Sequence, residues 1–302
     1  MASVLRDLIA PLRPPFLMVP PSSVALGAGA ALWLGHDINL FYLLLALVGA
    51  TAAHGSVNAL NCYMDFRSGL DARTNPTPFS GMIPMLRQRP ERVSFALISG
   101  VGALTISALV GIYFLTVWGW GLLPLGLLGI FLIVAYTPWI TRLPAISLIA
   151  PGLGIGMFMV NGTYFVLTGS YSWTAFFASL VPFWLISELL VINQFPDVEP
   201  DESVGRRNYV ILLGRKRASR IYAVMLWATY VSILVGWVLG HLPVGALLGL
   251  LTTPWAVQTT RDAYRHADDI EGLLPVLAKN VQVCVLTPAL TALGILLSVW
   301  LS

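Results

Sequence analysis

Residues 58–71 (NALNCYMDFRSGLD) place amide and carboxylate side chains where a hydrophobic stretch ends. Asn61 and Asp65 are four residues apart, so on a helix their side chains share a face. Asp71 is six residues from Asp65 and would point elsewhere on a continuous helix. Gly69 can end the helix and let the chain turn back, which would bring Asp71 to Asp65 around one ion.

A second stretch of the same kind, residues 193–201 (NQFPDVEPD), also follows a hydrophobic run. Asn193, Asp197 and Asp201 are spaced by four residues each, and we expect them along one helix face. Pro196 should distort this helix and Pro200 should end it near Glu199, because proline removes a backbone hydrogen bond. The repeated pattern predicts two similar halves of the chain with a site between them.

Oxygen ligands of this kind favour a hard divalent cation. Mg²⁺ usually takes one or two carboxylates and completes its shell with water and substrate phosphate oxygens. Arg73, Arg206 and Arg207, next to the two stretches, could bind phosphate oxygens directly. These residues predict a site for a metal-bound diphosphate. The alternative is that the carboxylates only pair with arginines at a membrane surface.

Polar side chains also continue from Asp65 back into the hydrophobic stretch. His54, Asn58 and Asn61 fall near one helix face, with His54 roughly 10 Å deeper than Asn61. Polar groups that face lipid are costly, so this stripe should face a cavity or other protein groups. For His54 the alternative is a hydrogen bond between helices. Glu188 lies inside another stretch, and we expect either a functional role or a hydrogen bond in its protonated form.

The composition indicates what positions these residues. The chain is 57% hydrophobic and 10% charged, whereas a soluble domain carries about 25% charged residues. Uncharged runs of about 20 residues can span a bilayer as helices. We predict an all-α polytopic membrane protein of one domain, residues 1–302, with two four-helix halves plus a ninth helix around a central cavity. The nine helices lie in residues 14–36, 38–64, 93–141 (two), 143–195 (two), 221–260 (two) and 280–302.

In this arrangement all 17 Lys and Arg residues lie on one side of the membrane. They fall in the segments 1–14, 66–92, 137–144, 197–220 and 258–279. Cytoplasmic loops collect such residues, so we expect the N-terminus and the site loops in the cytoplasm, the C-terminus outside, and the bacterial inner membrane as the location. Most of these residues orient the protein or contact anionic lipid, and no nucleic-acid partner is expected.

The two stretches resemble the motifs of a known family. Residues 54–71 resemble the first motif of the UbiA superfamily of intramembrane prenyltransferases, in the form H-x-x-x-N-x-x-N-x-x-x-D-x-x-x-G-x-D of its 1,4-dihydroxy-2-naphthoate branch. Residues 193–201, with Gly205, Arg206 and Arg207, resemble the second motif. The pairs Arg13-Pro14 and Tyr136-Thr137, the latter followed by Pro138, also fit.

The resemblance implies an enzyme that transfers a polyprenyl group from polyprenyl diphosphate to an aromatic acceptor, namely 1,4-dihydroxy-2-naphthoate in menaquinone biosynthesis. It implies two Mg²⁺ ions and membrane lipid as surroundings. The implied catalytic and metal-binding carboxylates are Asp65, Asp71, Asp197 and Asp201, and the amides that assist them are Asn61 and Asn193. The implied substrate-binding residues are Asn61, Asn193, Arg73, Arg206, Arg207, His54 and Asn58.

Two alternatives remain open at this point. Met82 stands where the branch usually has glycine, which leaves room for a UbiA-type terpene cyclase or for a prenyltransferase with another acceptor. A secondary transporter would place its ionisable groups near the bilayer midplane. Here only His54 and Glu188 lie deep, so transport is the remote alternative.

Overall fold

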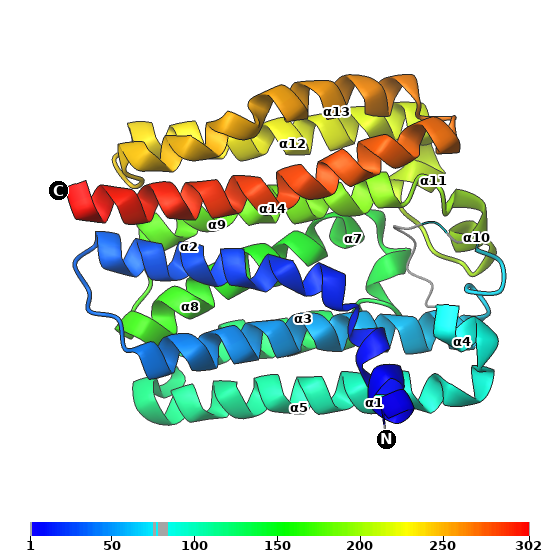
Figure 1. Ribbon diagram of the computed structural model, residues 1–302, viewed down its shortest axis with the longest axis horizontal. Helices are drawn as coiled ribbons and strands as arrows, with labels where there is room; N and C mark the ends of the chain where they lie inside the picture. The colour runs from blue at the N-terminus through cyan, green and yellow to red at the C-terminus, as the bar shows by residue number, and fades with distance from the viewer. Residues whose placement is uncertain (1, 75–76, 78–83, 302) are drawn as a thin grey trace.

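The computed structural model describes residues 2–74, 77 and 84–301. Within these ranges the regular elements are helices, and the long ones run along a common axis (Figure 1). Met82, on which the cyclase alternative depends, lies outside the described residues.

The first half of the chain contains two long helices and several short ones. Asn39 begins the longest of them by accepting hydrogen bonds from the N–H groups of Phe41 and Tyr42, and Gly69 ends it in the left-handed conformation (φ 76°), as expected. The elements are α1 (Ala2–Ile9), η1 (Ala10–Leu12), η2 (Pro14–Met18), α2 (Val19–Trp33), α3 (Leu40–Ser68), α4 (Pro84–Gln88), η3 (Pro90–Arg92), α5 (Val93–Trp118), η4 (Gly119–Leu122) and α6 (Leu123–Ala135).

The second half begins with a helix that changes its winding. α7 (Pro144–Pro151) passes through a π-helical segment, η6 (Gly152–Phe158), into α8 (Met159–Thr168). The carbonyl of Ile155 in this segment accepts a hydrogen bond from Ser23 of α2 at 3.1 Å. The remaining elements are η5 (Ile140–Arg142), α9 (Trp173–Asn193), α10 (Val198–Ser203), α11 (Tyr209–Leu213), α12 (Arg215–Val238), η7 (Val244–Thr252), α13 (Thr253–Arg265) and α14 (Ile270–Leu301).

Seven stretches within the described residues are long and apolar enough to cross a membrane: Pro14–Trp33, Leu40–Ser68, Pro90–Ala135, Pro144–Thr168, Trp173–Asn193, Arg215–Val238 and Ile270–Leu301. The sequence predicted nine. The two helices expected within 93–141 fall into one stretch, which η4 and Gly119 (φ 74°) interrupt. The expected helix near 244–260 begins as the 3-10 helix η7.

Glycines allow close helix crossings in the centre of the molecule. A Cβ on Gly152 or Gly156 of the π-helical segment would lie 2.2 Å or 2.4 Å from backbone atoms of Phe183 in α9. A Cβ on Gly294 of α14 would lie 1.8 Å from the carbonyl oxygen of Gly245. These crossings pack backbone against backbone, and the two that involve Phe183 fix the position of α9. The second polar stretch begins at the C-terminal end of α9.

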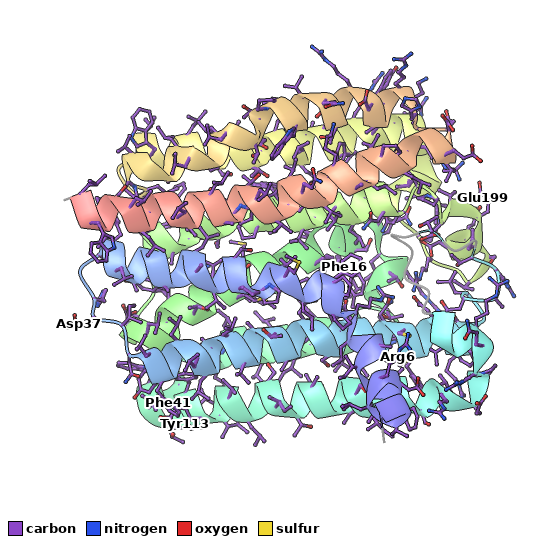
Figure 2. All side chains as sticks on the ribbon, viewed as in Figure 1. Arg6, Phe16, Asp37, Phe41, Tyr113 and Glu199 are labelled. Atoms are coloured by element: carbon purple, nitrogen blue, oxygen red, sulfur yellow. The ribbon has the colours of Figure 1, made fainter. Side chains whose placement is uncertain are left out.

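Charged side chains mark the two ends of the bundle. Figure 2 shows Asp37 at one end of the long axis and Glu199 at the other. Asp37 lies in the α2–α3 connection, whereas Glu199 lies in α10, close to the sites where α3 and α9 end. The polar stretches predicted from the sequence therefore occupy the Glu199 end.

Candidate active site

The two polar stretches meet in one pocket of about 150 Å³ at the Glu199 end of the bundle. Its walls come from the ends of α3 and α9, the turns that follow them, the segment before α11, Arg13, and the chain from Tyr136 to the start of α7. All six residues predicted to bind metal line this pocket: Asn61, Asp65, Asp71, Asn193, Asp197 and Asp201.

The first stretch folds as its sequence predicts. After Gly69, the N–H of Leu70 donates to the carbonyl of Asp65 at 3.1 Å, which closes the helix end. The turn then carries Asp71 back to the wall that Asp65 lines. A continuous helix would have pointed these two carboxylates apart.

The second stretch differs from the expected single helix face. α9 ends at Asn193, and a new short helix, α10, begins after Asp197, which occupies its N-cap position. The helix ends before Pro196 because the residue preceding a proline disfavours the helical conformation. Pro200 lies within α10 and does not end it, since proline is tolerated in a first helical turn. The break still brings Asp197 and Asp201 into the same pocket.

Arg206 joins the two stretches. One of its guanidinium nitrogens pairs with Asp65 and the other donates to Oδ1 of Asp201 at 2.9 Å. Burial lowers the pKa of Arg206, but the charges of Asp65 and Asp201 outweigh it and raise the pKa overall. The guanidinium therefore stays charged and occupies the space between the two carboxylates.

Other oxygens of the pocket have no such partner. Oδ2 of Asp71, Oδ1 of Asn193 and Oδ1 of Asp197 are buried and make no hydrogen bond within the described structure. Burial raises the pKa of Asp71, and burial followed by the charge of Asp201 raises the pKa of Asp197 to about 7. Unpaired buried acceptors are costly, so this pocket favours a positively charged ligand.

A hard divalent cation fits these donors, because carboxylate and amide oxygens are the ligands that Mg²⁺ prefers. Across residues 2–74, 77 and 84–301, no three His, Cys, Asp or Glu side chains form a ready metal cluster. At sites where Mg²⁺ bridges a protein to a phosphate, water and phosphate oxygens complete the shell that one or two carboxylates begin.

A second, apolar cavity of about 600 Å³ adjoins the acidic pocket. It lies between α3, α5, α6 and the helix formed by η6 and α8. Five residues line both spaces: Arg13, Asn61, Tyr136, Leu190 and Asn193. The two spaces therefore share a boundary, with charged side chains on one side of it and mainly hydrocarbon side chains on the other.

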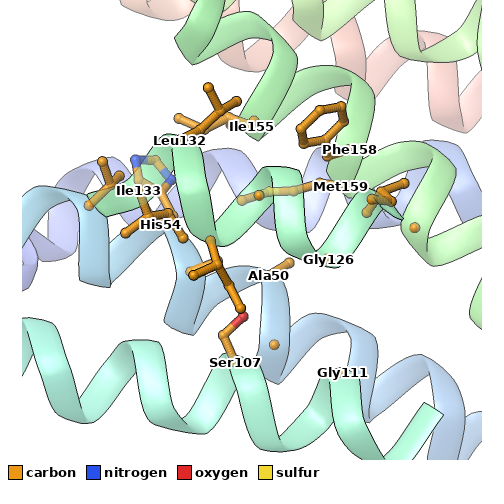
Figure 3. Close-up of a pocket in the computed structure, with 18 of the residues that line it drawn as sticks. Ala50, His54, Ser107, Gly111, Gly126, Leu132, Ile133, Ile155, Phe158 and Met159 are labelled. Atoms are coloured by element: carbon orange, nitrogen blue, oxygen red, sulfur yellow. The ribbon is translucent and has the colours of Figure 1, made fainter. Parts of the chain in front are cut away.

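His54 is a polar group on the wall of the apolar cavity (Figure 3). Its side chain is 6% exposed, and its Nδ1 makes no hydrogen bond within the described structure. Nδ1 therefore does not make the hydrogen bond between helices that was the alternative for His54. Asn58 also lines the cavity, and its amide donates to the carbonyl of Leu12 at 3.1 Å, so it supports the turn before α2.

Arg13 belongs to the site, although the sequence pointed to it only through the Arg13-Pro14 pair. Its backbone is left-handed (φ 53°), and it is the one non-glycine residue with positive φ among those described. Such strain costs on the order of 1–3 kcal/mol and clusters at functional sites. The guanidinium of Arg13 donates to Oδ1 of Asn61 at 3.5 Å. The amide nitrogen of Asn61 in turn donates to the hydroxyl of Thr137 at 3.1 Å.

Arg73 and Arg207 lie outside both cavities. Arg73 is exposed and donates to the carbonyl and the hydroxyl of Ser203 at 3.2 Å and 2.9 Å. Arg207 is also exposed, and its backbone N–H bonds the carbonyl of Thr141. Their role in phosphate binding stays a prediction, whereas Arg206 stands within the pocket.

Glu188 faces away from the site. It is fully buried and accepts hydrogen bonds from the amide of Asn280 at 3.0 Å and from the thiol of Cys284 at 3.3 Å, both in α14. Asn280 also accepts from the hydroxyl of Tyr222 in α12 at 2.8 Å. Of the two alternatives for Glu188, the structure shows the hydrogen bond between helices, which ties α9 to α14 and, through Asn280, to α12.

The chain is similar in sequence to known proteins. The sequence model of the UbiA prenyltransferase family matches residues 22–272. Over 294 residues the chain is 28% identical to the 1,4-dihydroxy-2-naphthoate octaprenyltransferase of Escherichia coli K12, with 96% of this chain and 94% of that protein covered.

Two solved structures share the fold. The apo structure of a UbiA homologue from Aeropyrum pernix K1 matches with a TM-score of 0.70 at 18% identity, over 94% of this chain and 98% of that one. A UbiA homologue from Archaeoglobus fulgidus bound to GPP and Mg²⁺ matches with a TM-score of 0.63 at 14% identity, over 96% and 99% of the two chains.

Proposed function

The chain belongs to the UbiA prenyltransferase family, and we propose that it transfers a polyprenyl group from polyprenyl diphosphate to 1,4-dihydroxy-2-naphthoate, a step of menaquinone biosynthesis. The observation that carries this proposal is the boundary that the acidic pocket and the apolar cavity share at Asn61, Tyr136 and Asn193. An amphipathic donor, anionic at one end and hydrocarbon at the other, matches both spaces at once. The activity of the E. coli relative supports the choice of acceptor.

The diphosphate would occupy the acidic pocket. Asp65 and Asp71 with Asn61, and Asp197 and Asp201 with Asn193, would hold two Mg²⁺ ions, which neutralise the charge that develops on the diphosphate as it leaves. The magnesium-bound structure of the Archaeoglobus relative supports the choice of metal.

Two arginines would supply further positive charge to the diphosphate site. Arg206 now pairs with Asp65 and Asp201. Once cations hold those carboxylates, its guanidinium becomes available to phosphate oxygens, which it matches in a two-pronged geometry. Arg13 lies on the boundary of the two spaces, where it can stabilise negative charge beside the reacting carbon.

The isoprenoid chain would lie in the apolar cavity, whose walls exclude water from the allylic carbon. The bond between this carbon and the diphosphate oxygen breaks, and its electron pair leaves with the diphosphate. The ring carbon that bears the carboxylate then bonds to the allylic carbon, and the carboxylate leaves as CO₂. His54, with Nδ1 unpartnered, is placed to bind a hydroxyl of the acceptor.

The membrane arrangement belongs to the same proposal. We expect nine crossings, with α6 and the segment from η7 to α13 added to the seven apolar stretches, and the site at the cytoplasmic face of a bacterial inner membrane. The supporting observation is that Asp37 lies at the opposite end from Glu199 (Figure 2), in a connection without Lys or Arg. The N-terminus would then be inside and the C-terminus outside.

The test is incubation of the purified protein with Mg²⁺, geranylgeranyl diphosphate and 1,4-dihydroxy-2-naphthoate, with the products identified by mass spectrometry. We expect a prenylated naphthoquinol and release of CO₂, and loss of both with EDTA or in Asp65→Ala and Asp197→Ala. Release of diphosphate with a cyclic hydrocarbon, without acceptor, would replace the proposal by a terpene cyclase. No turnover with any aromatic acceptor would refute it.

A further inference from the structure

Two glycines face the apolar cavity at the same level. Gly111 on α5 and Gly126 on α6 line it near Ala50 of α3 (Figure 3). A Cβ built on either glycine meets no atom within 4 Å. By contrast, a Cβ on Gly49 would lie 3.0 Å from the side chain of Val110. Gly111 and Gly126, hereafter the glycine pair, therefore border open space and do not serve a helix contact.

The distance between the glycine pair and the acidic pocket can be estimated from the helical rise per residue. Gly126 precedes Tyr136 by ten residues, or about 15 Å of helix, and Ala50 precedes Asn61 by eleven residues, or about 17 Å. Tyr136 and Asn61 line the acidic pocket. An isoprene unit adds four backbone bonds of about 1.5 Å, so an extended unit spans about 5 Å. About three units thus reach from the diphosphate site to the glycine pair.

The surroundings show where a longer chain can go. Phe114 and Leu122, which follow Gly111 and precede Gly126 in the chain, also line the cavity and belong to a buried hydrophobic cluster. Ile112 and Leu127, next to the two glycines in the chain, line the cavity and are each 56% exposed. His54, buried with its Nδ1 unpartnered, faces the cavity on the diphosphate side of this level.

We propose that the glycine pair is the passage through which isoprenoid donors longer than about three units continue beyond the cavity toward lipid, so that Gly111 and Gly126 determine the accepted donor length. This inference rests on the proposed function. A Cβ at these positions would displace no neighbour, so a larger side chain there would begin in open space and extend into the passage. Short donors would still fit between the acidic pocket and the glycine pair.

The experiment compares kcat/KM for octaprenyl and geranyl diphosphates, with one acceptor, in the full-length enzyme and in Gly111→Leu and Gly126→Leu. We expect the octaprenyl-to-geranyl ratio to fall about tenfold or more in each variant, the usual scale of an overpacked site. The matched control is Gly102→Leu. Gly102 is an exposed glycine of α5, also with no atom within 4 Å of a Cβ, and it does not line the cavity. Its ratio should equal that of the unaltered enzyme.

A ratio unchanged in both leucine variants would overturn the inference and leave the proposed function intact. Failure of the unaltered enzyme to transfer either group would instead refute the proposed function itself. If a leucine variant does not fold, Gly111→Ala and Gly126→Ala keep the test: a smaller fall in the ratio supports the passage, and an unchanged ratio overturns it.

Discussion

Removing the Arg206 side chain should destabilise the protein and also increase its response to Mg²⁺. In Arg206→Ala, the buried carboxylates of Asp65 and Asp201 lose their shared partner. Arg206 is 17% exposed, and the two carboxylate side chains are 8% and 6% exposed. Breaking a buried pair from one side costs about 3–5 kcal/mol. At the lower end of that range we expect a melting temperature lower by about 6 °C.

Mg²⁺ should recover much of this loss, because a cation can replace the missing positive charge between the carboxylates. The assay is thermal unfolding in detergent, without Mg²⁺ and at Mg²⁺ concentrations raised in about tenfold steps around its apparent Kd. The rise in melting temperature on adding Mg²⁺ should be larger for Arg206→Ala than for the unaltered protein. The prenyl transfer rate should nevertheless fall on the order of 100-fold, the usual cost of one lost donor to a developing anion.

Two further variants separate charge from position. Arg206→Lys keeps the charge but loses the two-pronged geometry, so its stability should lie between the other two proteins. Arg89→Ala removes a 50% exposed arginine 3.5 Å from Asp7 and should cost less than about 1 kcal/mol. An Arg206→Ala variant with unchanged melting temperature, or with a smaller Mg²⁺ response than the unaltered protein, would refute the reasoning.

Three other predictions concern the pocket and its support. Mg²⁺ affinity should weaken by up to about tenfold as the pH falls from 8 to 6. The pKa of Asp197 is about 7, so protons compete with the metal for its carboxylate below that pH. Calorimetric titrations that give the same Mg²⁺ affinity at both pH values would contradict this. Glu188→Gln should change the free energy of unfolding by less than about 1 kcal/mol, since the amide keeps hydrogen-bonding capacity. Glu188→Leu should cost about 1–3 kcal/mol by removing the oxygen to which the buried amide of Asn280 donates. Equal stability of both variants would count against the role of this bond. Gly294→Ala should cost about 1–3 kcal/mol in a denaturant titration, because its Cβ would lie 1.8 Å from the carbonyl oxygen of Gly245, and a neutral change would show that the crossing relaxes.

The sequence was sufficient to predict how the first polar stretch folds, because the interactions that shape it are local. The four-residue spacing of Asn61 and Asp65 and the helix-ending Gly69 act within one or two turns, and the structure has both features. The second stretch was harder to predict, because two prolines compete over where the helix ends. Pro196 ended α9, whereas Pro200 was accommodated in the first turn of α10.

The residues that sequence reasoning did not single out depend on contacts between distant segments. Arg13 joins the site through a left-handed backbone and a contact with Asn61, 48 residues away. No periodicity reports such a contact. The cavity glycines were equally hidden, since a glycine that borders open space and one that allows a close helix crossing look the same in a sequence. Only the position of neighbouring atoms separates Gly126 from Gly152.

The π-helical segment Gly152–Phe158 has a consequence for how this cavity can change during evolution. A π turn holds one residue more than an α turn. Deleting one residue there would return the segment to an ordinary helix, and α7 and α8 would keep their orientations because the extra residue is taken up within the π turn. The same deletion inside α8 would rotate all residues after it by about 100°. Met159, Gly162 and Val166, which line the cavity, would therefore keep facing it after a deletion in the π-helical segment. A single deletion there could reshape the cavity wall at Gly152–Phe158 alone and leave the carboxylates in place.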